Sequence, residues 1–254
     1  MWRGRARLSL VLAIGAGLVT TSGFAWTLGG SGISGWDTRE LIIHYNPTGC
    51  PLPAGTLEAT LDKAIAVWNQ IPTAGITLSR AEKPSSTTAE ELFSNTATDS
   101  PVVICDPDFA THAKANPDGV PAATQIRVLD PSHDNIDYGG TALNAEQGTR
   151  AEISRLTSDQ LTVALAHELG HILGLGHSGL PQALMYYSLD GKSGPELNQD
   201  DKDGLSYLYP QNDFADGPFG CQAVHPRGSP ASLGWLFAFV LVQVVVGRRW
   251  WGRP

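Results

Sequence analysis

Residues 167–177 constrain the fold and chemistry of this chain more than any other part of its sequence. They read His-Glu-Leu-Gly-His-Ile-Leu-Gly-Leu-Gly-His and fit the pattern HExxHxxGxxH. On an α-helix, residues four apart lie on the same face, so His167 and His171 can direct their imidazoles at one metal ion. Gly174 lies where the helix must end, since glycine tolerates the backbone conformation that such ends often need. The turn would bring in His177 as a third ligand.

Three protein ligands beside a carboxylate are typical of a catalytic zinc site. A structural zinc ion is usually closed by four protein ligands, whereas three leave the fourth tetrahedral position open. Glu168 is next to the first ligand and need not bind the metal, so it can hold a water molecule and act as a general base. We therefore expect one Zn²⁺ ion, held by His167, His171 and His177, with Glu168 as the catalytic residue.

The residues around the motif predict a helix with two different faces. Thr157 and Gln160 are spaced as a capping box, which marks a helix start. One stripe of the helix is apolar, and the histidines fall on the opposite side, so the helix would bury the stripe and turn the histidines toward a cleft. The stripe consists of Leu161, Leu165, Leu169 and Ile172.

A second feature lies downstream, where Met185 follows Ala183-Leu184 and precedes Tyr186. With the histidine motif, it resembles the metzincin metallopeptidases, in which a methionine packs beneath the metal-binding histidines. The resemblance implies that Met185 forms this Met-turn. Ser178, directly after the third histidine, and residues 197–209, with their Asp-Asp and Leu-Tyr pattern, resemble the matrixin branch of the metzincins.

Tyr187 stands two residues after Met185. In the astacins and serralysins, a tyrosine at this spacing approaches the zinc, which makes Tyr187 a candidate stabiliser of the transition state. Matrixins usually differ at this position. The alternative is an aromatic ring that packs against the lower subdomain.

The rest of the pattern predicts an α+β fold. Strands are expected over residues 41–45, 76–78, 101–105, 125–129 and 151–153, an amphipathic helix over 56–71, and a closing helix within 197–209 that Asn198 and Asp201 cap. Residues 81–100 are interpreted as a polar excursion or short helix near the cleft rim. This order resembles the metzincin catalytic domain. It implies a twisted mixed β-sheet with helices, a zinc-binding active-site helix and a smaller irregular C-terminal subdomain with the Met-turn.

The sequence departs from the matrixins in two respects. No propeptide with a cysteine switch is recognised before Trp36, so latency through a thiolate on zinc is not expected. The spaced histidines of the matrixin structural zinc are also not found, because His44, His112 and His133 are scattered. Each of these three is interpreted as a surface or loop histidine.

An acidic, turn-rich stretch contains Asp130, Asp134 and Asp137. Carboxylates are the oxygen ligands that Ca²⁺ prefers, so a calcium site is one interpretation. An acidic loop that binds no ion is the alternative, and we favour it.

Cys50 and Cys105 fall within the same predicted domain. In an exported protein two such cysteines can pair, and we favour a disulfide over two buried thiols. Sequence alone does not show that their geometry permits the bond.

The two ends of the chain are interpreted as targeting segments. Arginines, an apolar run over residues 8–19 and small residues up to Ala25 predict a signal peptide over 1–25, with a retained helical anchor as the alternative. The peptidase domain is expected over 26–212. Residues 213–232 are interpreted as a linker with Cys221, and 233–254 as an apolar span with an arginine-rich tail.

This order of cysteine, apolar span and arginines resembles the MYXO-CTERM sorting tails of myxobacterial surface proteins. The resemblance implies that Cys221 is the processing site and that a sorting protease is a partner. A C-terminal membrane anchor with its arginines inside is the alternative. Both interpretations place the domain outside the cytoplasm, either on the cell surface or secreted.

The composition narrows the set of partners. A formal net charge of −8 is unfavourable for binding nucleic acid. The trimmed domain is long enough to form one core. We also expect a monomer. We expect a zinc-dependent endopeptidase that hydrolyses proteins or peptides outside the cell. A non-catalytic, zinc-containing surface binding module is the alternative. Glu168 argues against that alternative, since zinc binding alone does not need this residue.

Overall fold

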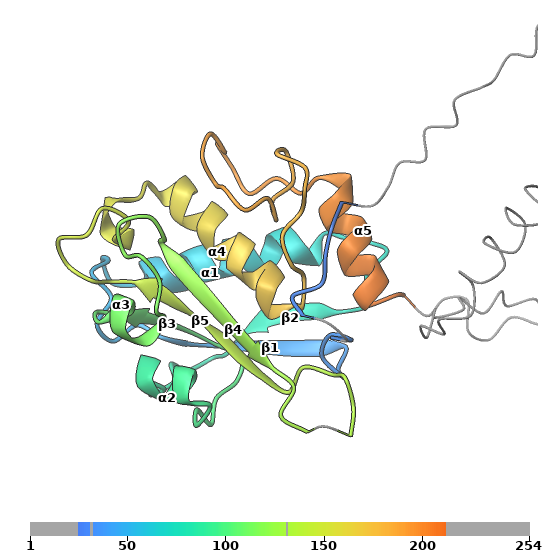
Figure 1. Ribbon diagram of the computed structural model, residues 1–254, viewed down its shortest axis with the longest axis horizontal. Coiled ribbons are helices and arrows are strands. Elements are labelled where there is room, and N and C mark those ends of the chain that lie inside the picture. Colours follow the sequence, from blue (N-terminus) through green and yellow to red (C-terminus); the bar gives the residue numbers. More distant parts are fainter. Residues whose placement is uncertain (1–24, 31–32, 131, 212–254) are drawn as a thin grey trace, which may run out of the picture. The chain divides into compact units, whose positions relative to one another are not determined.

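A five-stranded mixed sheet organises the chain, with the strand order β2-β1-β3-β5-β4 (Figure 1). The computed structural model describes residues 25–30, 33–130 and 132–211. Strands β1, β2, β3 and β5 are parallel, whereas β4 runs antiparallel to β5 at one edge. The strands are β1 (Glu40–Asn46), β2 (Thr77–Arg80), β3 (Val102–Asp106), β4 (Ala122–Arg127) and β5 (Tyr138–Asn144).

Helices cover both faces of the sheet. The long helices α1 (Thr56–Asn69) and α4 (Ser158–Ile172) pack on one face, and the short helices α2 (Ala89–Ser94) and α3 (Phe109–His112) pack on the other (Figure 1). Buried Trp68 joins the two long helices, because its Nε1 donates a hydrogen bond to the Ala166 carbonyl at 2.8 Å. This contact fixes α4 against α1 and places its other side along β4 and β5.

Helix α4 begins and ends as its sequence predicts. Thr157 accepts a hydrogen bond from the Gln160 amide, and the Gln160 side chain accepts one from the Thr157 amide, which completes a capping box. At the other end, Gly174 has a φ of 97°, a value that residues with a Cβ rarely adopt. The chain can therefore leave the helix and turn back beneath it.

A smaller, irregular part follows α4. Residues 173–198 contain no helix or strand, and the chain then forms α5 (Gln199–Leu208), which Asn198 and Asp201 cap. Tyr209 closes this part, because its hydroxyl donates to the Leu173 carbonyl at 2.8 Å. Burial raises the pKa of Tyr209 well above its usual range, so the hydroxyl keeps its proton. The predicted α+β architecture is thus confirmed.

Three local predictions were wrong, and one strand was missed. Residues 151–153 form no strand, because a 3-10 turn (Ile153–Arg155) leads into α4 instead. Strand β4 begins three residues before the predicted strand at 125, and β5 was not predicted at all. The short helix α2 exists within 81–100, but it packs against the face of the sheet opposite α4 and does not border the cleft.

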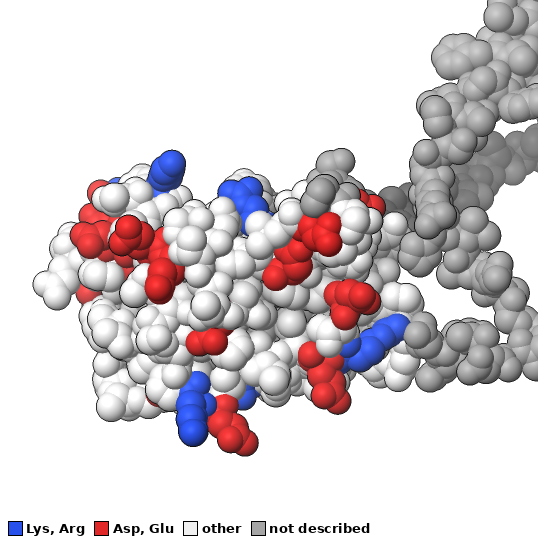
Figure 2. All heavy atoms as spheres, turned by 90° about the horizontal axis from the view of Figure 1, so that it is seen from below, with Lys and Arg blue, Asp and Glu red and all other residues white. Residues whose placement is uncertain are grey.

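Neither end of the chain can be compared with its predicted role. The predicted signal peptide up to residue 24, the linker with Cys221 and the C-terminal apolar span lie outside the described residues. Of the helices that the structure does describe, none is long and apolar enough to cross a membrane. The face seen in Figure 2 shows acidic and basic side chains in small, separate groups, with uncharged surface between them.

A disulfide joins the loop after β1 to strand β3. Cys50 and Cys105 are bonded through their sulfurs, with Cα atoms 5.0 Å apart and a sequence separation of 55. Such a cross-link stabilises the fold mainly by restricting the unfolded chain, and the restriction grows with the length of the closed loop.

Reduction of this disulfide is expected to lower the free energy of unfolding by about 4 kcal/mol, given the length of the loop that it closes. Urea unfolding with and without a reductant measures the change. A double variant, Cys50→Ser with Cys105→Ser, is the control. Its unfolding midpoint should equal that of the reduced protein and should not change when reductant is added. Equal midpoints for oxidised and reduced protein would contradict the expectation.

Candidate metal centre

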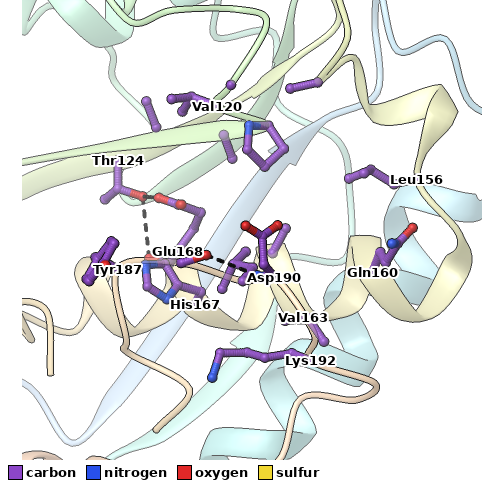
Figure 3. Close-up of a pocket in the computed structure, with 18 of the residues that line it drawn as sticks. Val120, Thr124, Leu156, Gln160, Val163, His167, Glu168, Tyr187, Asp190 and Lys192 are labelled. Carbon is purple, nitrogen blue, oxygen red and sulfur yellow. Dashed lines mark hydrogen bonds between the residues drawn. The ribbon is translucent and has the colours of Figure 1, made fainter. Parts of the chain in front are cut away.

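An open cleft of about 760 Å³ lies between helix α4 and strand β4 (Figure 3). One wall is residues 119–124, which comprise the start of β4 and the turn before it. The opposite wall is residues 187–192, which follow the Met-turn. Between the two walls, the cleft meets His167, Glu168, His171 and His177. The cleft therefore exposes the whole predicted site to a ligand from solvent.

The structure brings the three predicted ligands together. The ligand nitrogens of His167, His171 and His177 lie within 4.8 Å of one another, and the ring centroids are 4.8 to 5.4 Å apart. The first two histidines come from consecutive turns of α4, and the third comes from the loop after Gly174. Within the described residues, no other group of three or more His, Cys, Asp or Glu side chains is close enough to share one ion.

Backbone carbonyls orient two of the rings. Nδ1 of His167 lies 2.8 Å from the Leu184 oxygen, and Nδ1 of His171 lies 2.8 Å from the Leu175 oxygen. A carbonyl oxygen can only accept a hydrogen bond, so the proton of each neutral ring belongs on Nδ1. Each Nε2 then presents its lone pair to the cleft, which is the arrangement that metal-bound histidines usually show.

The electrostatics of the site favour the neutral forms of His167 and His177. Burial lowers the pKa of His167 to about 4, with further lowering from His171 and His177 against an opposing effect of Glu168. Partial desolvation of its ring lowers the pKa of His177, again with help from His171, although the residue as a whole is exposed. A metal ion binds only the unprotonated ring, so these shifts favour binding at neutral pH.

The geometry fits a zinc ion. Nε2 of His167 lies 3.1 Å from Nε2 of His171, although both atoms carry lone pairs that repel each other. Two ligands about 2.05 Å from a tetrahedral ion would be separated by about 3.3 Å, so a cation between them would replace the repulsion with two bonds. Three nitrogen ligands that leave the fourth coordination position open are typical of a catalytic zinc site.

Met185 packs directly beneath the motif, as the Met-turn resemblance implies. A Cβ atom at Gly170 would collide with the Met185 sulfur and with the ring of Trp68. The absence of a side chain at Gly170 thus lets Met185 approach α4 between the two histidine ligands. Met185 is itself buried, and its carbonyl accepts a hydrogen bond from the Ser178 amide at 2.7 Å.

Two acids of α5 hold this lower part of the site. The carboxylate of Asp201 accepts hydrogen bonds from the amides of Leu184 at 2.7 Å and Met185 at 2.9 Å. Asp200 accepts from the Ser178 hydroxyl at 2.6 Å. Both acids are buried, and burial raises the pKa of Asp201 while the three amides that bond to it oppose the rise. Sequence analysis found Asp201 only as a helix cap.

Asp201→Ala is expected to lower the free energy of unfolding by about 3 kcal/mol or more, because buried amides of the Met-turn would lose their acceptor. Thermal unfolding of the metal-free protein measures the effect. Asp203→Ala is the matched control on the same helix, since Asp203 bonds only to the exposed side chain of Gln199. Equal losses in the two variants would show that Asp201 has no special role.

The N-terminal segment supports the loop that carries the third ligand. The amide of Gly176 donates to the Thr27 carbonyl at 2.7 Å, and the Thr27 hydroxyl donates to the His177 carbonyl at 2.8 Å. The amides of Ala25 and Trp26 donate to the Asp200 carboxylate at 2.9 and 3.1 Å. The described part of this segment flanks the loop and does not line the cleft.

The wall formed by residues 187–192 carries Tyr187, which is 68% exposed. The centroids of the Tyr187 and Tyr186 rings are 4.3 Å apart. The tyrosine thus stands at the mouth of the cleft rather than in the core. Lys192 fastens this wall to the Met-turn segment, since its ammonium donates to the carbonyls of Ala183 at 2.6 Å and Pro181 at 3.0 Å. Burial lowers the pKa of Lys192.

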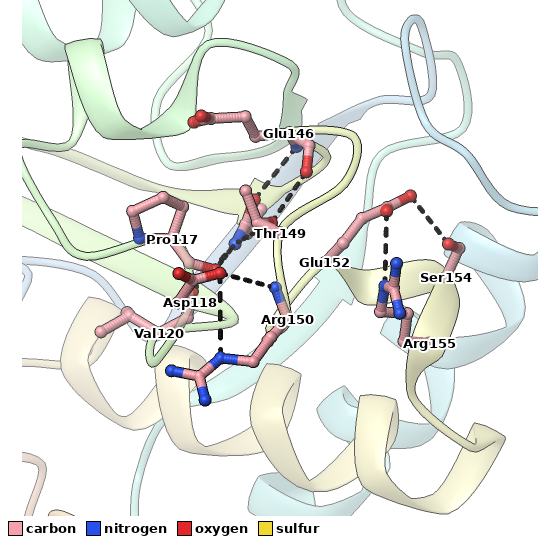
Figure 4. A network of polar contacts seen from close by, with 10 residues as sticks. Pro117, Asp118, Val120, Glu146, Thr149, Arg150, Glu152, Ser154 and Arg155 are labelled. Atoms are coloured by element: carbon pink, nitrogen blue, oxygen red, sulfur yellow. Dashed lines mark hydrogen bonds and ion pairs between the residues drawn. The ribbon is translucent and has the colours of Figure 1, made fainter.

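A polar network holds the turn before β4, and therefore also the cleft wall formed by residues 119–124 (Figure 4). Buried Asn144 donates to the carbonyls of Pro117 at 2.8 Å and Val120 at 3.2 Å. The Asp118 carboxylate accepts from the Arg150 amide at 2.9 Å. Both walls are thus tied to the body of the domain, which favours a cleft formed before any ligand arrives.

The other candidate ligands lie apart from the site. His112 bonds to buried Asp106 on β3, and His133 lies in the exposed loop between β4 and β5. In the same loop, Asp137 accepts from the amides of Leu129 and Asp130, so its carboxylate stabilises the loop itself. Asp130, Asp134 and Asp137 do not form a ligand group of the kind found at the histidines, and calcium binding stays a prediction.

Thr124 contacts Glu168 from the sheet and was not identified from the sequence. Thr124 on β4 donates to Glu168 Oε2 at 2.6 Å, and the two residues are 44 positions apart. A threonine in a strand is ordinary in sequence, so no local pattern pointed to it. Only the pairing of β4 with the rest of the sheet brings its hydroxyl to the helix.

Comparison with known proteins agrees with this geometry. The sequence profile of the family described as Matrixin matches residues 36–210. Stromelysin-1 of Mus musculus is 27% identical over 208 residues, which cover 77% of this chain and 37% of that protein. Matrix metalloproteinase-25 of Homo sapiens is 27% identical over 181 residues, covering 68% of this chain and 29% of that protein.

Similarity is higher over a shorter stretch. Matrix metalloproteinase-9 of Canis lupus familiaris is 49% identical over 49 residues, covering 19% of this chain and 7% of that protein. The chain thus spans well under half the length of these curated relatives.

Proposed function

Because the chain belongs to the matrixin family of zinc metalloendopeptidases, we propose that it hydrolyses internal bonds of proteins or peptides at the cleft between α4 and β4. One observation carries the proposal: three imidazoles converge beside a carboxylate in an open cleft. The match to the family covers the helix, the third ligand, the Met-turn and α5.

His167, His171 and His177 would hold the zinc ion through their ring nitrogens. When bound, zinc supplies a Lewis acid that polarises the peptide carbonyl and makes a water molecule more acidic. Among the described residues, none donates a hydrogen bond to Oε1 of Glu168, whereas Oε2 is held by Thr124. Oε1 is therefore the oxygen that can receive a proton.

Glu168 acts as the proton carrier in this proposal. Its carboxylate takes a proton from water as the water oxygen forms a bond to the carbonyl carbon of the substrate. The same proton then passes to the amide nitrogen as the bond between carbon and nitrogen breaks, which releases an amine and a carboxylic acid. No covalent intermediate with the protein is needed.

Strand β4 offers a place for the substrate backbone. It is the edge strand of the sheet, and its start lines the cleft, so within the described residues one side of its backbone has no neighbouring strand. An extended peptide can add to such an edge through main-chain hydrogen bonds. Peptides of many sequences would then bind in one orientation. This arrangement favours unfolded segments or exposed loops of proteins as substrates.

The test is hydrolysis of casein or gelatin by the purified domain, with and without the chelator o-phenanthroline. The proposal predicts cleavage that the chelator stops and that added zinc restores. A folded, zinc-loaded protein that cleaves neither substrate would support the alternative, a non-catalytic surface binding module. Cleavage that continues without metal would contradict the zinc mechanism.

We further propose that the domain acts outside the cytoplasm as a monomer. The predicted signal peptide over residues 1–25 and the disulfide between Cys50 and Cys105 both support export, since disulfides persist in oxidising compartments. The tail after residue 212 would be processed at Cys221 by a sorting protease or would remain as an anchor. Mass spectrometry of the mature protein, purified from the organism that produces it, would identify its N-terminal and C-terminal residues.

A further inference from the structure

We propose that Thr124 is a positioning residue that holds the carboxylate of Glu168 through a chain of hydroxyl groups continuing to Thr141. Thr124 lies on the edge strand β4, and Thr141 lies directly opposite it on β5. The hydroxyl of Thr124 is 2.6 Å from Glu168 Oε2 (Figure 3). The same hydroxyl is 2.6 Å from the hydroxyl of Thr141. The inference rests on the proposed function of Glu168.

The direction of these hydrogen bonds follows from the number of protons. An ionised carboxylate can only accept, so Thr124 must donate its single hydroxyl proton to Glu168. Thr124 then accepts from Thr141. The donated protons therefore run in one direction, from Thr141 through Thr124 to Glu168.

Burial makes this chain specific. Thr141 is fully buried and Glu168 nearly so, whereas Thr124 is half-buried on the wall of the cleft, so the end of the chain at Thr141 is shielded from water. A hydroxyl that donates to a carboxylate forms one of the shorter and stronger hydrogen bonds in proteins, and a second bond in series strengthens the first. Two strands and one helix thus fix the position of a single oxygen atom.

Fixing Oε2 also fixes the rest of the carboxylate. The terminal torsion of a glutamate side chain is broad, so without a partner the group would sample many orientations. With Oε2 held on the side of the sheet, Oε1 is left for the proton transfer. Placing a reacting group in advance raises the rate of the chemical step rather than the affinity for the substrate.

Thr124→Val keeps the shape of the side chain and removes its hydroxyl. It is expected to lower kcat by between about 10-fold and about 100-fold, the loss that corresponds to one hydrogen bond to a charged group. KM and zinc content should stay unchanged. Thr124→Ser, which keeps the hydroxyl, should restore most of kcat. Thr77→Val is the matched control, since Thr77 is an exposed strand residue on β2, at the opposite edge of the sheet.

A structural readout separates this inference from the proposed function. In crystals of zinc-loaded protein, Glu168 should show one side-chain conformation in the wild type and in Thr124→Ser, but several in Thr124→Val. This measurement tests the positioning even if the wild type cleaves no substrate, an outcome that would refute only the proposed function.

Two results would overturn the inference. One is a Thr124→Val variant with wild-type kcat and an ordered Glu168. The other is a Thr124→Ser variant as slow as Thr124→Val, because the loss would then come from packing rather than from the hydroxyl. Thermal unfolding of each variant shows whether it is folded. If Thr124→Val does not fold, kcat and the order of Glu168 in Thr124→Ser test the inference.

Discussion

Glu168→Gln is expected to slow peptide hydrolysis by about 100-fold to about 10,000-fold, the usual contribution of a general base. Glutamine has nearly the same shape and can still accept a hydrogen bond from Thr124. It cannot take a proton from water at neutral pH. The three ligands are unchanged, so zinc content and the melting temperature should match those of the wild type.

Steady-state kinetics on a fluorogenic peptide, with metal analysis of the same sample, measures both quantities. Glu90→Gln on helix α2 is the matched control, because this exposed glutamate lies on the far side of the sheet and should have no effect. Turnover within a few-fold of the wild type in a zinc-loaded Glu168→Gln protein would show that the assigned base is wrong.

His177→Ala is the second change with a large expected effect. Removing one of three ligands should weaken zinc binding by more than about 100-fold, since even residues that only support a ligand contribute between about 10-fold and 100-fold. His177 is exposed and comes from a loop, whereas His167 is buried in α4. The metal-free variant should therefore unfold at nearly the wild-type temperature.

The measurement is a zinc titration against a competing chelator, together with thermal unfolding in the presence and absence of zinc. A ligand that binds only the folded state raises the melting temperature, so the zinc-dependent rise should shrink in the variant. His133→Ala is the control, because this histidine lies in the loop between β4 and β5. Unchanged zinc affinity in His177→Ala would remove it from the ligand set.

The parts of the site that sequence could predict are those made by local geometry. His167 and His171 are one helical turn apart, so the motif alone brings them together, and Gly174 marks the turn that returns His177. The capping pairs at the starts of α4 and α5 are equally local, since each partner is two or three residues away. In each case, the sequence contains the whole interaction within a few residues.

The missed parts depend on contacts between distant segments. Strand β5 is buried along its whole length, because β3 and β4 flank it and helices cover both faces. It therefore shows no alternation of polar and apolar residues, and its Gly139-Gly140 pair resembled a turn. The contact of Thr124 with Glu168 and that of Asp201 with the Met-turn likewise exist only after the sheet and α5 have packed.

The hydrogen bonds from α5 imply an order of events during biosynthesis. The histidines of α4 leave the ribosome well before Asp201 and Tyr209, which secure the Met-turn and the end of α4. A nascent chain that stops before α5 thus contains every zinc ligand but lacks the contacts that fix them. We expect ribosome-bound chains that end before α5 to have no peptidase activity. They would therefore not cleave neighbouring proteins during translation.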